Sequence, residues 1–118
     1  MINITIYRTE SGKFQSFEMS GHALFADRGK DIVCAGVSAV SVGAINAVHE
    51  LTGVTPDLEH RADGFLRCVI PGGLSEDVYE RVQLILEAMA VSLRSIEETY
   101  GEHIKITFKK AGGGMKCY

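Results

Sequence analysis

The sequence predicts an α+β domain of order β-β-α-β-β-α-β, in which a mainly antiparallel sheet packs against two helices. Three observations lead to this fold class. Short runs near the start, middle and end of the chain alternate apolar with polar residues, as half-buried strands do. A long run of small and apolar residues follows Asp31, and a later segment carries an apolar stripe at helical spacing. Hairpins that alternate with helices favour a sheet covered by those helices.

The first two strands are predicted to form a hairpin. In "INITIY", Ile2, Ile4 and Ile6 share one face. After a turn at Ser11-Gly12, "KFQSFEMS" continues the alternation. A polar loop then follows, from residue 21 to residue 30.

The first helix is predicted to begin after Asp31, a residue type that accepts hydrogen bonds from the N–H groups of a helix start. It covers "IVCAGVSAVSVGAINAVHELT" and ends before Gly53, which suits the left-handed conformation that follows many helices. Its alanine, glycine, serine and valine content suits close packing inside the domain.

The remainder of the chain repeats the pattern. A second hairpin turns at Asp63-Gly64, and Ser75 is predicted to cap a second helix. Its core-facing stripe runs to Gly101 and comprises Val78, Val82, Ile85, Met89, Leu93, Ile96 and Tyr100. "HIKITFK" forms the last strand. We therefore expect one domain over residues 1–110, followed by a flexible, glycine-rich tail over 111–118.

Composition limits the classes of function. The net charge is −3, so the chain lacks the basic surface that dominates nucleic-acid binding, and we expect no direct nucleic-acid partner. No signal sequence is recognisable, and no stretch reaches the about 18 uncharged apolar residues of a membrane span. These features predict a cytoplasmic protein without a membrane partner. The three cysteines form no CxxC pair, and no histidine–cysteine cluster predicts a metal or other cofactor.

Cys34 is the candidate nucleophile. It is the third residue of the predicted first helix, and the positive end of a helix favours a thiolate. The alternative is a small apolar residue in a tightly packed helix start. Helix-start N–H groups, including that of Cys34, are candidates to stabilise an oxyanion.

His22 is the candidate general base, because it follows the second strand where the chain leaves the sheet toward that helix. His49 lies fifteen residues beyond Cys34 on the same helix, about 22 Å away, which is too far for it to act as the base. His60 and His103 are predicted to be ordinary surface residues, because no cysteine is adjacent to them in sequence.

Three residues of this region have alternative roles. Asp31 either caps the helix or orients His22 as the third member of a triad, whereas Asp27 is a second acid for the latter role. Ser38 lies one helical turn after Cys34, where its hydroxyl contacts either the catalytic pair or a helix carbonyl.

The segment "SGHALFADRGKDIVCAGVSA" and the order of elements resemble the bacterial ribosomal-processing cysteine protease family called Prp. In that family a GHA motif supplies a histidine and a DIVCAGVSA motif supplies a cysteine. The resemblance implies that His22 is the general base and Cys34 the nucleophile. It also implies a substrate, large-subunit ribosomal protein twenty-seven with an N-terminal extension, cut after a phenylalanine in a hydrophobic motif. A homodimer is expected on the same ground.

The loop between the two motifs is then expected to act as a substrate flap. Leu24 and Phe25 would contact apolar residues of the substrate, and Gly29 would let the loop bend. The alternative is that both apolar side chains pack on the sheet.

Two rival functions stay open on the residues. One is a non-enzymatic, ribosome-associated module that binds a protein or RNA segment, with Cys34 merely buried. The other is a thiol redox protein, which would need the distant Cys68 or Cys117 as its resolving cysteine.

Overall fold

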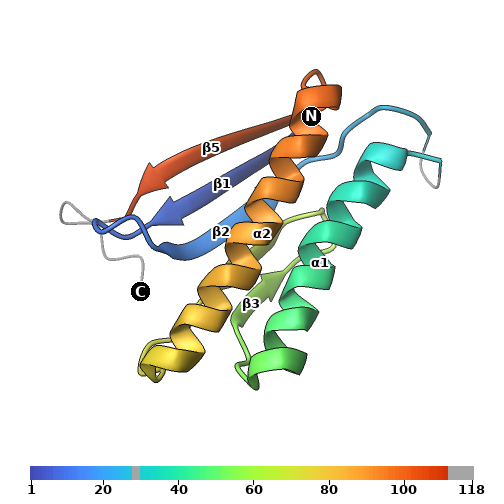
Figure 1. Cartoon of the computed structure of the whole chain (residues 1–118). Helices are drawn as coiled ribbons and strands as arrows, with labels where there is room; N and C mark the ends of the chain where they lie inside the picture. The colour runs from blue at the N-terminus through green and yellow to red at the C-terminus, as the bar shows by residue number, and fades with distance from the viewer. Residues whose placement is uncertain (28–29, 112–118) are drawn as a thin grey trace.

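The computed structural model describes residues 1–27 and 30–111 of the chain. One five-stranded sheet carries two helices side by side on one face (Figure 1). The elements, in chain order, are β1 (Ile2–Arg8), β2 (Phe14–Ser20), α1 (Ile32–Thr52), β3 (Asp57–His60), β4 (Leu66–Val69), α2 (Glu76–Tyr100) and β5 (Ile104–Lys110). The predicted fold class and order of elements are confirmed.

The sheet has the strand order β3-β4-β2-β1-β5 and is mixed. Three of its four pairings are antiparallel, and β5 lies parallel to β1, with Ile2 opposite Ile104. Parallel pairing follows from the helix that separates β5 from the preceding strands, because such a crossover returns the chain to the same end of the sheet. Ile2, Ile4 and Ile6 are buried in the core, as their alternation predicts.

The hairpin of β1 and β2 contains an irregularity that simple alternation did not predict. Tyr7 pairs with Ser16 but Arg8 pairs with Phe14, so Gln15 is an extra residue in β2. The insertion allows both Phe14 and Phe17 to be buried, with their rings in edge contact at 6.1 Å between centroids.

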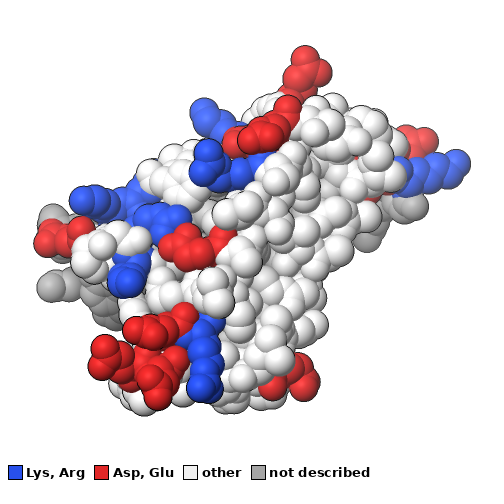
Figure 2. All heavy atoms as spheres, in the orientation of Figure 1, with Lys and Arg blue, Asp and Glu red and all other residues white. Residues whose placement is uncertain are grey.

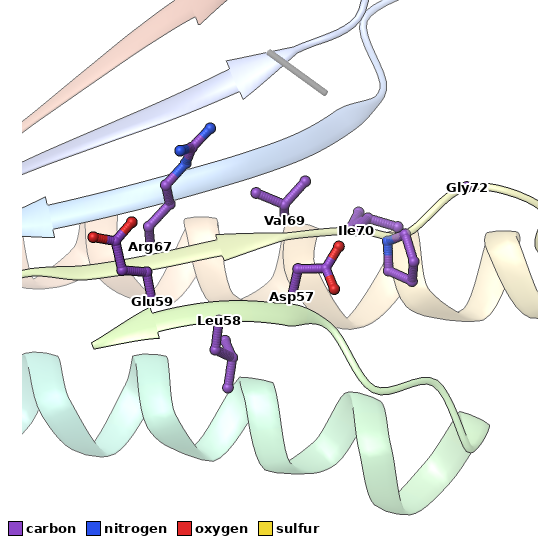
Figure 3. A pocket seen from close by; sticks show the side chains of 8 residues that line it. Asp57, Leu58, Glu59, Arg67, Val69, Ile70 and Gly72 are labelled. Carbon is purple, nitrogen blue, oxygen red and sulfur yellow. The ribbon is translucent and has the colours of Figure 1, made fainter.

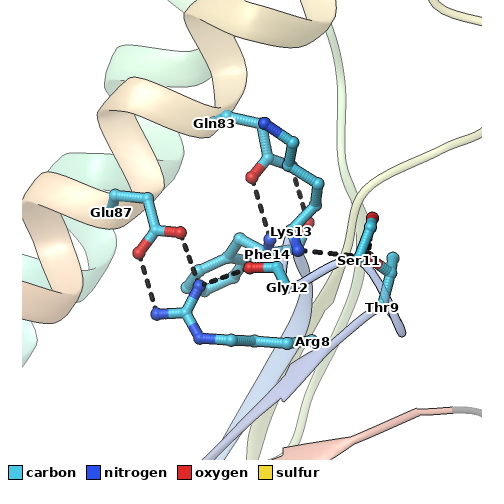
Figure 4. Close-up of polar contacts among 8 residues, drawn as sticks. All are labelled: Arg8, Thr9, Ser11, Gly12, Lys13, Phe14, Gln83 and Glu87. Atoms are coloured by element: carbon cyan, nitrogen blue, oxygen red, sulfur yellow. Dashed lines mark hydrogen bonds and ion pairs between the residues drawn. The ribbon is translucent and has the colours of Figure 1, made fainter.

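Gln83 of α2 binds the backbone beside this bulge. Its Nε2 donates to the Phe14 carbonyl at 2.7 Å, and its Oε1 accepts from the Phe14 N–H at 2.8 Å (Figure 4). Nearby, Arg8 forms a two-pronged ion pair with Glu87, also on α2. Polar side chains therefore attach the hairpin to the helix at the place where the strand ladder is interrupted.

The helices begin and end as the sequence predicts. Asp31 caps the start of α1. Gly53 follows the last residue of the helix at φ 76° and donates its N–H to the His49 carbonyl. Ser75 caps α2. The two helices run in opposite directions, so the first turn of α1 lies at the same end of the molecule as the last turn of α2 (Figure 1).

Helix α1 is more apolar than the sequence analysis allowed. By length and composition alone it is long enough to cross a membrane, with a mean hydropathy of 1.7 over its most apolar 18 residues. The expectation that no such stretch exists was wrong, because residues 32–49 contain no Asp, Glu, Lys or Arg and are mostly valine, isoleucine and alanine. Val33, Val37, Ser41, Ile45 and Val48 form its buried stripe. Figure 2 shows that the outward surface over α1 is almost free of charge.

The end of the described chain is held to the sheet. Ala111 is buried, 3% exposed, and donates its N–H to the Arg8 carbonyl. The predicted tail began at this residue, and its other members, 112–118, lie outside the described residues.

Replacement of Gln83 by leucine should lower the free energy of unfolding by about 2 to 4 kcal/mol, because it leaves both buried polar groups of Phe14 without a partner. Leu84→Ala is the matched control, since Leu84 is exposed on the next position of α2 and its loss should cost no more than about 0.5 kcal/mol. Denaturant unfolding of both variants measures the difference. Equal stabilities would contradict the role given to Gln83.

Candidate active site

A cavity of about 500 Å³ opens where β2 ends and α1 begins. Three parts of the chain line it: the segment after β2, the first two turns of α1, and the turn between β3 and β4. Its lining residues are His22, Leu24, Ala26, Asp31, Cys34, Ala35, Ser38 and Ala62. The structure therefore brings the two predicted catalytic residues to one cavity.

The position of His22 depends on glycines before it and across from it. Gly21 has φ 87°, and a Cβ there would overlap the Met1 carbonyl oxygen, so only glycine allows the chain to leave β2 at this point. The His22 ring then lies over Gly64 in the turn between β3 and β4. A Cβ built on Gly64 would lie 3.4 Å from His22 Nε2 and 3.3 Å from Cε1. Sequence reasoning identified Gly64 as a turn residue but not as the surface on which the imidazole rests.

Cys34 is half-buried in the first turn of α1. Its Sγ accepts a hydrogen bond from the N–H of Ala23 at 3.3 Å. Of the hydrogen bonds formed by residues 1–27 and 30–111, none joins the His22 ring to this sulfur. The two candidate residues thus line one cavity without a direct hydrogen bond between them in this structure.

Asp31 uses both carboxylate oxygens on the backbone. Oδ1 accepts from the N–H groups of Val33 and Cys34, each at 3.0 Å, and Oδ2 accepts from the Phe25 N–H at 3.0 Å. The Cys34 N–H, and after it the N–H groups of Phe25 and Ala26, lower the pKa of Asp31 against desolvation, which raises it. The cap that the sequence predicts is present, whereas no hydrogen bond in the described part of the chain connects Asp31 with His22. The Cys34 N–H, a candidate oxyanion donor, is already bound to this carboxylate.

Cys68 provides a contrast to Cys34. It is buried in β4, 1% exposed, and desolvation raises the pKa of its thiol to about 12. A thiol that stays protonated and enclosed reacts slowly with oxidants and electrophiles. This environment argues against Cys68 as a resolving cysteine; Cys117, the other candidate for that role, lies outside the described residues.

The predicted flap residues have different environments. Leu24 is 77% exposed beside the cavity, with φ 57°, a left-handed conformation that is costly for a leucine. Phe25 instead packs edge-on against the rings of Tyr100 and His103, with centroids 5.5 and 5.2 Å away. Phe25 therefore docks the loop on the end of α2, a contact that neither sequence alternative included.

The remaining predicted residues are also located. Ser38 lines the cavity one turn beyond Cys34, and Asp27 is exposed in the loop, where its carbonyl accepts the Lys30 N–H. Gly29 lies outside the described residues.

His103 was wrongly predicted to be an ordinary surface residue. It is half-buried, and its Nδ1 lies 2.9 Å from the Ala23 carbonyl oxygen. Sequence spacing gave no signal for this contact, because the two residues are 80 positions apart. His49 and His60 are exposed, as expected, but His60 also lines a smaller cavity, of about 170 Å³, together with His22 and Cys34. Across the described ranges, no group of three or more His, Cys, Asp or Glu side chains is suited to a metal ion.

A second cavity, of about 370 Å³, lies along β3 and β4. Figure 3 shows Glu59 and Arg67 projecting from neighbouring strands on the same side, while Leu58 points toward α1. Of the described residues that line this cavity, none is a cysteine, serine or histidine. It therefore lacks a nucleophile, and the cavity at Cys34 is the better candidate for chemistry.

Comparison with known proteins now decides the family. The sequence model of the family described as cysteine protease Prp matches residues 1–105. The chain belongs to the cysteine protease Prp family. The ribosomal processing cysteine protease Prp of Bacillus subtilis (strain 168) is 44% identical over 108 residues, which cover 91% of this chain and 96% of the relative.

Solved Prp structures share the fold. The crystal structure of an essential ribosomal processing protease Prp from S. aureus, in complex with a covalently linked product peptide, superposes with a TM-score of 0.84 at 38% identity. The match covers 92% of this chain and the whole of the S. aureus chain. The same S. aureus protease in complex with a substrate peptide gives a TM-score of 0.78 at 37% identity, with the same coverage. The expected family and the class of cysteine protease are thus confirmed.

Replacement of Gly64 by alanine should lower kcat/KM for peptide cleavage about tenfold or more, because the added methyl group displaces the His22 ring. Gly12→Ala is the matched control. Gly12 has nearly the same backbone angle, φ 88° against 91°, in the other hairpin turn, and nothing lies within 4 Å of a Cβ there. Both variants place alanine at nearly the same positive φ, so similar activities would contradict the contact between Gly64 and His22.

Asp31→Asn should lower the thermal unfolding midpoint at about pH 6.5, because the amide nitrogen cannot accept the Phe25 N–H. The pKa of Asp31 is lowered in the folded state from its ordinary value of 3.8. Its contribution is therefore present above that value and is lost as the pH falls through the folded-state pKa.

The difference between the wild type and this variant should accordingly begin to shrink as the pH falls below the ordinary pKa of 3.8, and should go on shrinking as the pH falls through the lower folded-state pKa. Thermal melts followed by circular dichroism across this range measure it. A difference that stays constant with pH would contradict the charged role of Asp31.

Proposed function

We propose that this chain is the endopeptidase that removes the N-terminal extension of large-subunit ribosomal protein twenty-seven, cutting after a phenylalanine in a hydrophobic motif. Cys34 acts as the nucleophile and His22 as the general base. The observation that carries the proposal is the half-buried Cys34 thiol, which shares one cavity with the His22 imidazole. The B. subtilis relative's name, ribosomal processing cysteine protease, supports the class of substrate.

The reaction follows from these two groups. His22 takes the thiol proton, and the sulfur of Cys34 attacks the carbonyl carbon of the scissile peptide bond. The C–N bond then breaks as the imidazolium gives its proton to the leaving amine, which leaves a thioester on Cys34. A water molecule, deprotonated by His22, attacks the thioester, and the S–C bond breaks to release the acid and restore the thiol.

The first proton transfer requires a rearrangement near the sulfur. No hydrogen bond among the described residues joins the His22 ring to Sγ, and the imidazole lies against Gly64 instead. Left-handed Leu24 stores conformational energy beside both groups, so its relaxation assists such a rearrangement when a peptide binds. Catalytic hydrogen bonds commonly tighten only in the substrate complex.

The cavity suits an apolar substrate segment. Leu24, Ala26, Ala35 and Ala62 supply its apolar lining. Such a lining favours a hydrophobic side chain of the substrate over a charged one. Asp27 is exposed at the loop and is available to a basic ribosomal protein, whereas Asp31 is committed to backbone N–H groups.

Family membership as a cysteine protease weighs against the non-enzymatic binding module. A module that only bound a ribosomal segment would also have no need for a histidine beside a cavity thiol. The redox alternative is weakened by the enclosed thiol of Cys68.

The proposal also includes a homodimer that works in the cytoplasm. The uncharged outward surface of α1 supports self-association, since Ile32 and Val42 are exposed there without charged neighbours on the helix. The location follows from the substrate, which is a ribosomal protein.

Cys34→Ala and His22→Ala should each lower the rate of cleavage at least about a thousandfold, because each removes a group that takes part in bond breaking. The substrate is a peptide that carries the extension and its phenylalanine, and cleavage is followed by mass spectrometry. His49→Ala is the control, since His49 is exposed far along α1. Wild-type turnover by either site variant, or cleavage at a different bond, would contradict the proposal.

A further inference from the structure

We propose that His103 is a positioning residue for the nucleophile: it holds Ala23 so that the Ala23 N–H stays directed at Cys34 Sγ and stabilises the thiolate. This inference rests on the proposed role of Cys34 and adds a residue from the opposite end of the sequence to the site.

The backbone of His103 is fixed by the scaffold. Its N–H donates to the Tyr100 carbonyl at 2.8 Å, and its own carbonyl accepts the Ile2 N–H at 2.8 Å. It therefore lies in the turn between α2 and β5, tied at once to the end of the helix and to the first residue of β1. A side chain that projects from such a turn is a firm anchor for a neighbouring loop.

The imidazole of His103 donates to the loop. Its Nδ1 lies 2.9 Å from the Ala23 carbonyl oxygen. Because a carbonyl oxygen only accepts hydrogen bonds, Nδ1 carries the proton. Ala23 is 1% exposed, so water does not compete for this carbonyl. The contact is thus a directional bond in a dry place and fixes the ring tautomer.

The other backbone polar group of Ala23 meets the nucleophile. Its N–H donates to Cys34 Sγ at 3.3 Å. Ala23 is consequently held at its carbonyl by the α2–β5 turn and contacts the sulfur through its N–H. A hydrogen bond to an ionised sulfur is stronger than one to a neutral thiol, so a fixed N–H favours the thiolate.

Neighbouring contacts reinforce this anchor. Phe25 packs edge-on against both His103 and Tyr100, and its N–H is held by Asp31. Between these two fixed residues Leu24 adopts its left-handed conformation at φ 57°. Such a conformation persists only when the flanking structure determines it. His103 contributes to both flanks, through its bond to Ala23 and its contact with Phe25.

The test compares two amides at position 103. In His103→Asn the side-chain N–H takes the place of Nδ1–H, whereas in His103→Gln it lies near the place of Nε2 and misses the Ala23 carbonyl. Both variants keep a neutral polar side chain. His49→Gln is the control for a histidine replaced away from the site.

The readout is the rate of iodoacetamide alkylation of Cys34 against pH, with the modified peptide identified by mass spectrometry. Other titratable groups that line the cavities at Cys34 are His22, Asp31 and His60, and all three are unchanged in these variants. We expect His103→Gln to move the midpoint of alkylation upward, which lowers the rate below the midpoint about three- to tenfold. His103→Asn and His49→Gln should keep the wild-type midpoint.

Two results would overturn the inference: a wild-type midpoint in His103→Gln, or equal upward shifts in the Gln and Asn variants. The second result would mean that the aromatic contact with Phe25, and not the bond to Ala23, matters. Alkylation requires no substrate, so the outcome is separate from the proposed protease function. A shift in His103→Gln with full cleavage by Cys34→Ala would uphold the positioning role and refute the proposed function.

Discussion

The carboxylate of Asp31 is the constraint on which the site depends. One oxygen accepts the N–H groups that begin α1, and the other holds the loop at Phe25. The same side chain therefore determines where the helix starts and where the preceding loop lies. Cys34 lies three residues after Asp31. The position of the helix start and of the loop together brings its sulfur to the backbone N–H of Ala23.

The cap argues against a mechanism in which free N–H groups at the helix start stabilise an anion. A helix start often offers free N–H groups to an anion, yet here the carboxylate occupies those of Val33 and Cys34. The donor that the sulfur contacts comes from the loop instead. Under the proposed mechanism, activation of the thiol therefore depends on the geometry of the loop and of the turns that carry Gly64 and His103, as well as on the helix.

The contacts that hold the β1–β2 hairpin on α2 lie at a different part of the sheet from the cavity at Cys34. The hairpin turn of β1 and β2 is attached to α2 by Gln83 and by the ion pair of Arg8 with Glu87. The cavity lies where β2 ends, beside the first turn of α1. Strain at Leu24 thus lies away from the contacts that hold the hairpin, which lets the loop change without loss of the sheet.

Local patterns in the sequence predicted most of the fold. Alternation located the strands, and Asp31, Gly53 and Ser75 marked helix ends correctly because capping acts over two to four residues. The placement of His22 and Cys34 beside each other was predicted because both lie in one short segment. The bulge at Gln15 escaped prediction because Gln83, whose side chain binds the backbone of the adjacent Phe14, is far away in sequence.

Gly64 and His103 were not predicted to contact the site, for the same reason. Their contacts with the segment after β2 arise only when separate turns come together at one end of the molecule. Neither residue belongs to a local motif with His22 or Cys34, and a turn glycine or a lone histidine has an ordinary explanation when read alone. Tertiary packing, which no spacing rule describes, gives them their place at the site.

The central claim is that Cys34 forms a covalent bond with the substrate, and acid-quench mass spectrometry tests it most directly. The protein is mixed with the extended ribosomal peptide, quenched in acid within a single turnover and digested. The account predicts a thioester adduct on the peptide that contains Cys34, with the mass of the N-terminal product and with no adduct at Cys68. Cleavage without any adduct, or an adduct on another residue, would contradict it.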